Sequence, residues 1–466
     1  MNHSAVGIQI LADRVKLRAN AQRGVIMQAQ RLLTQLQAQQ TASLGEYFGN
    51  PSFAETASLG APFSSVRRVA VVTESFLPKV DGVVKTVYLS VRYLQDTGRE
   101  VLVFAPDIAV DHIGDSQVIP LPSIGLPQAP ETRMALPNPM VARRIEAFQP
   151  DLIHLFSPAA MAVSGMAAGR HLNLPVIANY QTDLPGYTEQ YGFPRLSGPV
   201  NRWLRYIHNG CHLTLAPTRT TIRQLRRAGF RRVRHWGRGV DTARFNPRWA
   251  CASMRRRLLK GRAADSLLCI FVGRLATEKR IDLLMELAQT PGIALTIIGD
   301  GAQREQLEAM YAHTDVHFTG YLIGDELAQA YASADVFVFP GEYETFGQVI
   351  QEAMASGLPS VVVDAGGAPD VIDDGASGMV VHPTAAAFAE AVCSLRDQAW
   401  LRAQMAVRAR TLAEARPWSA LMAQLERYYE EAYSLNRRFT RRFGSTHYHL
   451  PLSIPTRLAR RPRSLS

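Results

Sequence analysis

Cysteine is scarce in this sequence, and no two cysteines are paired by spacing. The four cysteines among 466 residues are far apart and form no Cys-x-x-Cys motif: Cys211, Cys251, Cys269 and Cys393. A disulfide framework or a thiolate zinc site is therefore not expected, and a reducing, cytoplasmic compartment fits best. His208 and His212 have a spacing that a helix could offer to a metal, but no carboxylate motif accompanies them, so packing is favoured.

Long apolar runs are missing as well. No segment approaches the roughly 18 to 20 apolar residues of a membrane-spanning helix, and the amino end lacks a signal-peptide core. We therefore expect a protein that at most sits on the inner face of a membrane. Its 47% hydrophobic and 20% charged residues are typical of a folded protein, and its length favours two domains.

Acidic residues are nearly absent from two stretches of the chain, whose formal net charge is +11. Residues 195–262 contain 18 Lys or Arg against the single acid Asp241, and residues 437–463 contain eight Arg and no acid. A solvated surface, docking on an anionic membrane and nucleic-acid binding are the alternatives for these stretches. Aromatic residues are sparse among the arginines, so nucleic acid is the least favoured partner.

Apolar segments of strand length alternate with helical segments in two successive blocks. The expected strands of the first block are 66–72, 101–105, 152–155, 176–179 and 213–217. Those of the second block are 268–272, 294–298, 316–319, 336–339 and 360–363. Such alternation is typical of parallel sheets covered by helices. We therefore predict an α/β protein with two Rossmann-like, doubly wound domains that face each other across a cleft.

The domain boundaries follow from these two blocks. Residues 1–65 carry apolar residues at helical spacing among Gln and Arg, which favours a helical or disordered appendage. The remaining predicted units are a first domain over 66–244, a linker over 245–264, a second domain over 265–417, a closing helix over 418–435 and a basic tail over 436–466.

Charged residues follow two expected strands of the second domain, where open parallel sheets bind their ligands. Arg274 and Lys279 follow the strand that ends at Val272, and together they can neutralise a diphosphate from two sides. A solvated cationic turn is the alternative for this segment alone. Glu344 and Glu352 follow the strand 336–339, and each carboxylate can accept hydrogen bonds from two neighbouring sugar hydroxyls.

The segment 344–352 resembles the Glu-x7-Glu signature of glycosyltransferase family four, whose members share the GT-B fold of two Rossmann-like domains. Segments 298–301, 318–322, 331–336 and 365–367 also stand in the family's order and spacing. The resemblance extends over about residues 66–435. It implies a hexosyltransferase that moves a hexose, with retention of configuration, from a nucleotide-diphosphate sugar to an acceptor hydroxyl.

The resemblance also assigns roles to single residues. Arg274 and Lys279 would hold the diphosphate and stabilise charge on the leaving group. Glu344 would hold the donor hexose and Glu352 the ribose hydroxyls. Gly82 would allow a close approach to the phosphates, because it has no side chain. The further donor-binding residues would be Gly273, the backbone at Tyr321 and Leu322, and the amides of Thr345, Phe346 and Gly347 at a helix start.

The first domain would supply the acceptor side. Residues 176–187 resemble the family's acceptor motif, and Asp183 together with Asp81 would lie near the acceptor. Gln181 stands where a histidine is common, and its amide can bind a hydroxyl but cannot exchange a proton near neutral pH. In the family's scheme the leaving phosphate helps to deprotonate the acceptor, which makes a histidine unnecessary.

No Asp-x-Asp occurs in the sequence, so the usual metal signature of the other large glycosyltransferase fold is missing. We expect neither a metal nor another cofactor, because the nucleotide sugar, a UDP- or GDP-hexose, is a substrate. Segments 73–84 and 236–245 are closest to members that glycosylate lipids, including mannosyl- and sulfoquinovosyl-transferases acting on diacylglycerol or phosphatidylinositol. The alternatives are a transferase that builds soluble glycans and an inactive scaffold that binds acidic membranes or nucleic acid.

Overall fold

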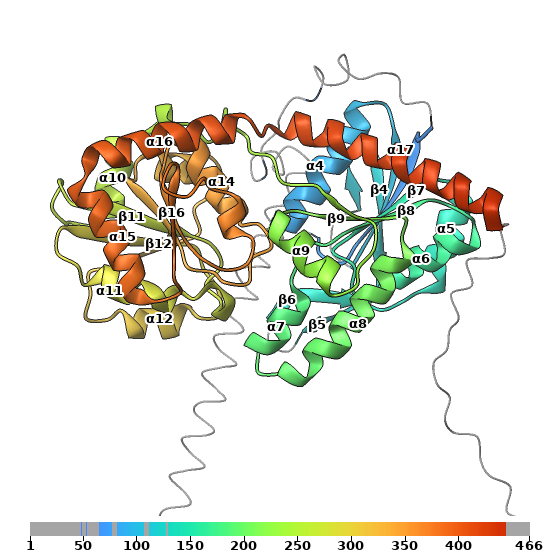
Figure 1. The fold of residues 1–466 in the computed structure, drawn as a ribbon, viewed down its shortest axis with the longest axis horizontal. Coiled ribbons are helices and arrows are strands. Elements are labelled where there is room, and N and C mark those ends of the chain that lie inside the picture. Colours follow the sequence, from blue (N-terminus) through green and yellow to red (C-terminus); the bar gives the residue numbers. More distant parts are fainter. Residues whose placement is uncertain are drawn as a thin grey trace, which may run out of the picture.

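Two α/β domains stand side by side in the computed structural model of this chain (Figure 1). The structure describes residues 65–76, 82–106, 111–126 and 129–443, together with Phe48 and Phe53. Most of the appendage predicted over residues 1–65, the tail beyond residue 443 and Asp81 therefore lie outside the described residues. Among the described residues, no helix is long and apolar enough to cross a membrane.

The first domain is built on an eight-stranded sheet with the order β10-β9-β8-β7-β1-β2-β4-β3. Its strands are β1 (Arg68–Thr73), β2 (Glu100–Pro106), β3 (His112–Ile113), β4 (Ser116–Leu121), β7 (Leu152–Phe156), β8 (Val176–Asn179), β9 (Leu213–Ala216) and β10 (Val233–His235). Its helices are α4 (Gly82–Asp96), α5 (Pro139–Phe148), α6 (Ala162–His171), α7 (Leu184–Gln190), α8 (Pro194–Gly210) and α9 (Arg219–Arg227). β3 pairs antiparallel with β4, and β5 (Ser123–Leu126) forms a separate hairpin with β6 (Ala129–Ala135).

The central strand β1 shows why this sheet is covered on both faces. Because side chains alternate along a strand, Val69 and Val71 face one layer of helices and Ala70 and Val72 face the other. All four side chains are completely buried or nearly so. A parallel strand that is apolar on both faces is stable only between two helical layers, which is the doubly wound arrangement predicted from the sequence.

The second domain is built on a six-stranded parallel sheet with the order β13-β12-β11-β14-β15-β16. Its strands are β11 (Leu267–Val272), β12 (Ile293–Ile298), β13 (His317–Gly320), β14 (Val336–Phe339), β15 (Ser360–Val363) and β16 (Gly378–Val381). Its helices are α10 (Ala252–Leu259), α11 (Met285–Ala288), α12 (Arg304–Met310), α13 (Gly324–Ala332), α14 (Gln348–Ala355), α15 (Ala385–Asp397) and α16 (Ala399–Glu414). Short 3-10 turns are η1 (Pro247–Trp249), η2 (Thr277–Lys279), η3 (Ile281–Leu284) and η4 (Ala368–Asp370).

All ten strands expected from the sequence are present within two residues of their expected ends. The strands that the sequence did not predict are β3, β4, β5, β6, β10 and β16. These strands are short or carry polar residues and proline, as in the Ser-Gln-Val-Ile-Pro-Leu sequence of β4. β10 and β16 are edge strands, and β3 and β4 close the other edge of the first sheet, so these strands need less apolar surface than the central ones.

Part of the predicted linker over 245–264 is built into the second domain. Phe245, Met254 and Leu258 are buried in its core, because α10 lays one apolar face on the sheet. The predicted closing helix is longer than residues 418–435, since α17 runs over Trp418–Phe443. Residues 436–443, predicted as the beginning of the tail, therefore form the last two turns of this helix.

Helix α17 leaves the second domain and lies along the first, next to α4 (Figure 1). Trp418, Met422 and Tyr429 are buried in the same apolar cluster as Val69 and Val71, which lie on one face of the first sheet. Glu426 is buried as well, where it accepts a hydrogen bond from Tyr93 at 2.6 Å and pairs with Arg99 at 3.0 Å. The carboxyl-terminal helix is thus a structural part of the first domain.

The chain crosses between the domains twice, and the two crossings touch. Val240 N–H on the outward crossing donates to the carbonyl of Arg416 on the returning one at 3.2 Å. A Cβ added to Gly239 would lie 2.7 Å from the backbone nitrogen of Trp418, which is closer than packed atoms allow. Glycine is therefore required where the crossings pass each other.

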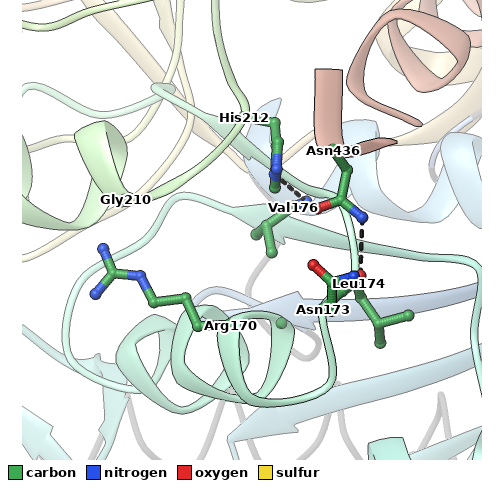
Figure 2. Close-up of a pocket in the computed structure, with 8 residues that line it drawn as sticks. Arg170, Asn173, Leu174, Val176, Gly210, His212 and Asn436 are labelled. Carbon is green, nitrogen blue, oxygen red and sulfur yellow. Dashed lines mark hydrogen bonds between the residues drawn. The ribbon is translucent and has the colours of Figure 1, made fainter. Parts of the chain in front are cut away.

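A small pocket lies on the first domain between the end of α6, the start of β8 and α17 (Figure 2). Val176 N–H donates to Nδ1 of His212 at 3.0 Å, and Asn436 donates to the carbonyl of Asn173 at 2.8 Å. Arg170 also lines the pocket. None of the residues predicted for the donor or the acceptor lies there.

Candidate active site

The loops that follow the strands of the two sheets meet between the domains. Thr345, which comes after β14, donates from Oγ1 to the carbonyl of Gln181, which comes after β8, at 2.6 Å. Thr218, which comes after β9, donates to the carbonyl of Thr345 at 3.2 Å. The carboxyl edges of the two sheets therefore face each other, as ligand sites in parallel α/β domains require.

Arg274 follows β11 and is held by a buried carboxylate. Its guanidinium donates to Glu278 Oε1 at 2.5 Å, and Glu278 is 1% exposed. The second oxygen of Glu278 accepts from the hydroxyl of Tyr191 in the first domain at 3.1 Å. Glu278 thus fixes the direction of Arg274 and also links the two domains at the predicted diphosphate site.

Lys279 and Glu344, predicted to hold the diphosphate and the hexose respectively, are joined to each other. Nζ of Lys279 donates to Oε1 of Glu344, and both side chains are largely buried. The ammonium also lies 5.7 Å from the ring centre of Phe339, at the end of β14. Because a charge that is largely removed from water must be compensated, the two groups balance each other's charge.

Glu352, predicted to bind the ribose, lies on α14 and is also paired. Its Oε1 accepts from Nζ of Lys85 at 2.7 Å, and its Oε2 lies 3.5 Å from the hydroxyl of Tyr331. Lys85 belongs to α4 of the first domain and is 7% exposed. The predicted ribose carboxylate therefore joins the two domains through a buried ion pair.

The turn before α14 is shaped by glycine. Gly347 has a φ of +83° and is the N-cap of α14, whose first residue is Gln348. Thr345 and Phe346 therefore lie in the loop before the helix and are not its first residues. Both side chains are buried. The helix start that was predicted over residues 345–347 is therefore shifted toward Gln348, because Gly347 takes a left-handed conformation that interrupts the helix.

Three other predicted donor residues differ in their surroundings. Gly273 directly follows β11, and its carbonyl would lie 1.9 Å from a Cβ added to Gly299, so the two loops pack backbone against backbone. Tyr321 is 59% exposed, and its hydroxyl donates to the carbonyl of Asp300 at 3.1 Å. Leu322 is buried in the second core, which leaves its backbone as the part that a base could contact.

Gly82 is the first residue of α4 and lies against the second domain. The nearest atom to an added Cβ would be Cβ of Gln348 on α14 at 3.7 Å, an ordinary contact distance. The protein itself would accept an alanine here. Any requirement for glycine at this position must therefore come from a ligand and not from the fold.

The acceptor-side residues of the first domain have distinct environments. Asp183 caps α7 by accepting from Gly186 N–H at 3.2 Å, and burial raises the pKa of its carboxyl. Gln181 is 7% exposed, and its Oε1 accepts from Ser157 at 3.4 Å. Its amide nitrogen is buried and has no hydrogen-bond partner.

Three buried charged residues of this region were not predicted as site residues: Glu74, Lys85 and Glu278. Each has a signal in the sequence. Glu74 directly follows an apolar strand, Lys85 interrupts the apolar face of a helix, and Glu278 lies between two predicted cations. Glu278 pairs with Arg274 four residues earlier, but the other partners of these residues are backbone groups or residues far along the chain, which the sequence does not reveal.

His208 and His212 pack as the sequence favoured. Nδ1 of His208 lies 3.2 Å from Oγ1 of Thr214, and burial lowers the pKa of His208 to about 3. Burial and the nearby Arg232 lower the pKa of His212 to about 4. Within the described ranges, no three His, Cys, Asp or Glu side chains gather closely enough to hold a metal ion.

Comparisons with known families agree with this architecture. Residues 80–244 match the family described as Glycosyltransferase Family 4, and residues 259–412 match the family described as Glycosyl transferases group 1. A crystal structure of HepE from Anabaena in complex with UDP superposes with a TM-score of 0.64 at 20% identity. It covers 78% of this chain and 99% of that one. This likeness supports the GT-B fold.

Three relatives are similar over most of the chain. The GDP-mannose-dependent alpha-mannosyltransferase of Mycobacterium tuberculosis is 39% identical over 373 residues, which cover 78% of this chain and 96% of the relative. The sulfoquinovosyl transferase SQD2 of Arabidopsis thaliana is 37% identical over 69% of this chain and 64% of its own length. The alpha-monoglucosyldiacylglycerol synthase of Acholeplasma laidlawii is 26% identical over 63% and 80%, respectively.

The matched ranges contain both strand-end loops described above. Arg274, Lys279, Glu344 and Glu352 lie in the range that matches group 1, and Gln181 and Asp183 lie in the range that matches family four. The chain therefore belongs to glycosyltransferase family four, and it is a hexosyltransferase with the GT-B fold.

Proposed function

We propose that this enzyme transfers a hexose from a nucleotide-diphosphate sugar to a hydroxyl of a membrane lipid, with retention of configuration and without a metal ion. One observation carries the proposal. Arg274, Lys279, Glu344 and Glu352 gather at the carboxyl edge of the second sheet and face the first domain.

The two cations suit the diphosphate of the donor. Arg274 offers paired donors and Lys279 a compact charge, and both would stabilise the negative charge that develops on the leaving diphosphate. In the transfer, the bond between the hexose C1 and the phosphate oxygen breaks and a bond from C1 to the acceptor oxygen forms. The proton of the acceptor hydroxyl passes to the leaving diphosphate, so that charge and atoms balance.

Two observations support attack from the face of the sugar that the phosphate leaves, which gives retention without a covalent intermediate. Glu344, the carboxylate assigned to the donor hexose, is neutralised by Lys279, which reduces its strength as a nucleophile. Gln181 cannot act as a base near neutral pH. The leaving phosphate then accepts the proton of the acceptor hydroxyl. Because this phosphate lies on the face of the sugar from which it departs, the acceptor attacks from that face and the configuration is retained.

The same cations support metal independence. The carboxylates of this region are already partnered by protein cations, Glu344 by Lys279 and Glu352 by Lys85. A diphosphate that enters beside Arg274 and Lys279 meets two positive charges without a bridging ion. We expect full activity in chelator, and activity that disappears in chelator and returns with magnesium or manganese would contradict the proposal.

The surface of α8 supports a lipid acceptor and a peripheral position on the membrane. Phe193 before the helix, with Leu196 and Trp203 on it, are each between 44% and 49% exposed and lie at helical spacing. Arg195 and Arg202 are exposed beside them. Apolar side chains flanked by arginines are typical of a helix that lies in the headgroup region of anionic membranes. The diacylglycerol named for one relative fits such a surface.

The test is nucleotide release from GDP-, UDP- and ADP-hexoses with diacylglycerol vesicles, with phosphatidylinositol vesicles and without lipid. We expect one donor and one lipid to give turnover, and the anomeric signal of the product to match that of the donor. Lys279→Ala and Glu344→Ala should each reduce turnover at least about a hundredfold. Turnover without lipid but with a soluble glycan would indicate a glycan-building transferase. No nucleotide release under any condition would favour the inactive scaffold.

A further inference from the structure

Three polar side chains lie together at the carboxyl edge of the first sheet. Glu74 directly follows β1, Ser157 directly follows β7, and Gln181 comes two residues after the end of β8. β7 lies between β1 and β8 and pairs in parallel with both, with Thr73 opposite Phe156 and Phe156 opposite Asn179. The three side chains therefore lie on one edge, and Thr345 of the donor domain contacts that edge through the carbonyl of Gln181.

Two buried atoms of this group have no hydrogen-bond partner. Oε1 of Glu74 accepts from the backbone N–H groups of Ala159 at 3.0 Å and Ala162 at 2.8 Å, but its Oε2 has no partner. The amide nitrogen Nε2 of Gln181 has none either. Leaving such groups unpaired costs free energy, so native proteins rarely do so without a reason.

The two unpartnered atoms are complementary in kind. Oε2 of Glu74 is an acceptor when the carboxyl is ionised, and Nε2 of Gln181 is a donor. An alcohol both donates and accepts, so an alcohol, or two adjacent alcohol oxygens, satisfies both atoms. A sugar-accepting hydroxyl has this chemistry, and Thr345, which follows Glu344 in the chain, contacts the same edge.

Glu74 also has a structural role, which involves its other oxygen, Oε1. Ala162 is the first residue of α6, so Oε1 of Glu74 satisfies a free N–H group at that helix start. The hydrogen bonds from Ala159 and Ala162 both use Oε1, and the Met161 N–H also lowers the pKa of the carboxyl. An amide oxygen would serve the helix start equally well, which leaves the second carboxylate oxygen without a structural explanation.

We propose that Glu74 binds the attacking hydroxyl of the acceptor: Oε2 accepts its hydrogen bond until the hydroxyl turns its proton to the leaving diphosphate, while Nε2 of Gln181 donates to the same or the adjacent oxygen. This assignment rests on the proposed transferase function and names the acceptor site within it. Ser157 donates to Oε1 of Gln181 at 3.4 Å, which leaves Nε2 as the part of the amide that can bind the acceptor.

The experiment compares Glu74→Gln with the wild-type enzyme in two reactions. The first is transfer from the active donor of the panel to vesicle lipid, or to glycerol as a small alcohol. The second is release of free hexose to water without an acceptor. Glu74→Gln keeps an oxygen for the helix start and replaces Oε2 by an N–H donor. We expect transfer to fall about tenfold to a hundredfold while release to water stays within about twofold.

Matched variants separate this role from a loss of stability. Glu426→Gln removes another buried carboxylate of the same domain, on α17 and bonded to Tyr93 and Arg99, and should leave the ratio of transfer to water release unchanged. Gln181→Leu should lower that ratio as Glu74→Gln does. Equal losses of both reactions in Glu74→Gln, or an unchanged ratio, would overturn the proposal. If the wild-type enzyme releases no nucleotide from any donor, the proposed function itself fails.

Discussion

Each carboxylate around the donor site has its own partner, and that partner determines the role of the carboxylate. Glu278 orients Arg274, Glu344 neutralises Lys279, and Glu352 bonds to Lys85. Glu74 is different, because backbone N–H groups are its partners and one of its oxygens has none. These differences lead to separate predictions for stability and for catalysis.

Glu74 makes the stability of the protein depend on pH. Burial raises the pKa of Glu74 from an ordinary 4.5 to about 7, although backbone N–H groups act in the opposite direction. The folded state therefore binds the proton more tightly than the unfolded state. The resulting stabilisation is fully present below about pH 4.5 and is lost as the pH rises to about 7, a change of roughly 3 kcal/mol.

Denaturant unfolding of the wild-type protein and of Glu74→Gln at pH 4.5 and pH 8 measures this effect. We expect the variant to gain stability relative to the wild-type protein as the pH rises, because its side chain does not titrate. Parallel pH dependence of the two unfolding free energies would contradict the assignment of a raised pKa to Glu74.

Glu278 positions Arg274, so its removal should weaken donor binding without removing a cation. Glu278→Gln loses the charge on a hydrogen bond of 2.5 Å. We expect kcat/KM for the donor to fall about tenfold to a hundredfold. Glu308→Gln on α12, which removes a carboxylate paired with Arg304 on the surface, is the control and should change kcat/KM little. Equal kinetics for the two variants would show that Arg274 needs no support.

At the scale of elements, the central strands were predictable and the edges were not. β8, β14 and β15 have the bounds expected from their apolar runs, because strands buried on both faces must be apolar throughout. The three-residue β10 and the proline-containing β4 have no such signal. The packing of α17 on the first sheet depends on contacts such as His154 with Tyr429, 275 residues apart, which no local pattern contains.

Some residues of the candidate site were predictable from the sequence, and others were not. Arg274, Lys279, Glu344 and Glu352 were predictable because they stand at fixed spacing after apolar strands. Lys85 was not, because its partner Glu352 lies 267 residues away in the other domain. Which carboxylate meets which cation depends on the approach of the two domains, and local sequence does not encode that approach.

The exposed apolar side chains at the start of α8 are expected to contribute to membrane binding. Phe193→Ser combined with Leu196→Ser removes two exposed apolar side chains at one end of the helix and keeps its arginines. We expect the binding constant for acidic vesicles to fall at least about tenfold, because full burial of an apolar side chain contributes about 1.5 to 3 kcal/mol and these two are already about half buried in the protein. Release of hexose to water should not change.

The matched control for α8 is Trp400→Ser, which removes an apolar side chain that is 62% exposed on α16 of the second domain. Its sedimentation should equal that of the wild-type protein. If both variants lose vesicle binding equally, the attachment does not depend on α8. If neither loses it, the attachment is electrostatic and is carried by the arginines.

At the scale of the whole molecule, the contacts described between the two domains are largely polar and involve the predicted donor site. Lys85 bonds to Glu352, Tyr191 to Glu278, and Thr345 to Gln181. The covalent links are the two crossings that touch at Val240 and Arg416. Domains joined by polar contacts and a narrow connection move relative to each other more readily than domains that share an apolar core. Donor binding and domain closure are therefore expected to be linked.

Lys85→Met tests this link, because it removes a buried ion pair between the domains while keeping most of the length of the side chain. Loss of one partner of a buried pair costs about 3 to 5 kcal/mol, which is enough to shift a closed state toward an open one more than a hundredfold. We expect a larger radius of gyration by X-ray scattering for Lys85→Met without nucleotide, and recovery of the wild-type value with saturating nucleotide diphosphate. Arg257→Met, which breaks a surface pair with Glu326 inside the second domain, should scatter like the wild-type protein. An unchanged radius for Lys85→Met would mean that the remaining contacts, at Tyr191 and Thr345, hold the domains together on their own.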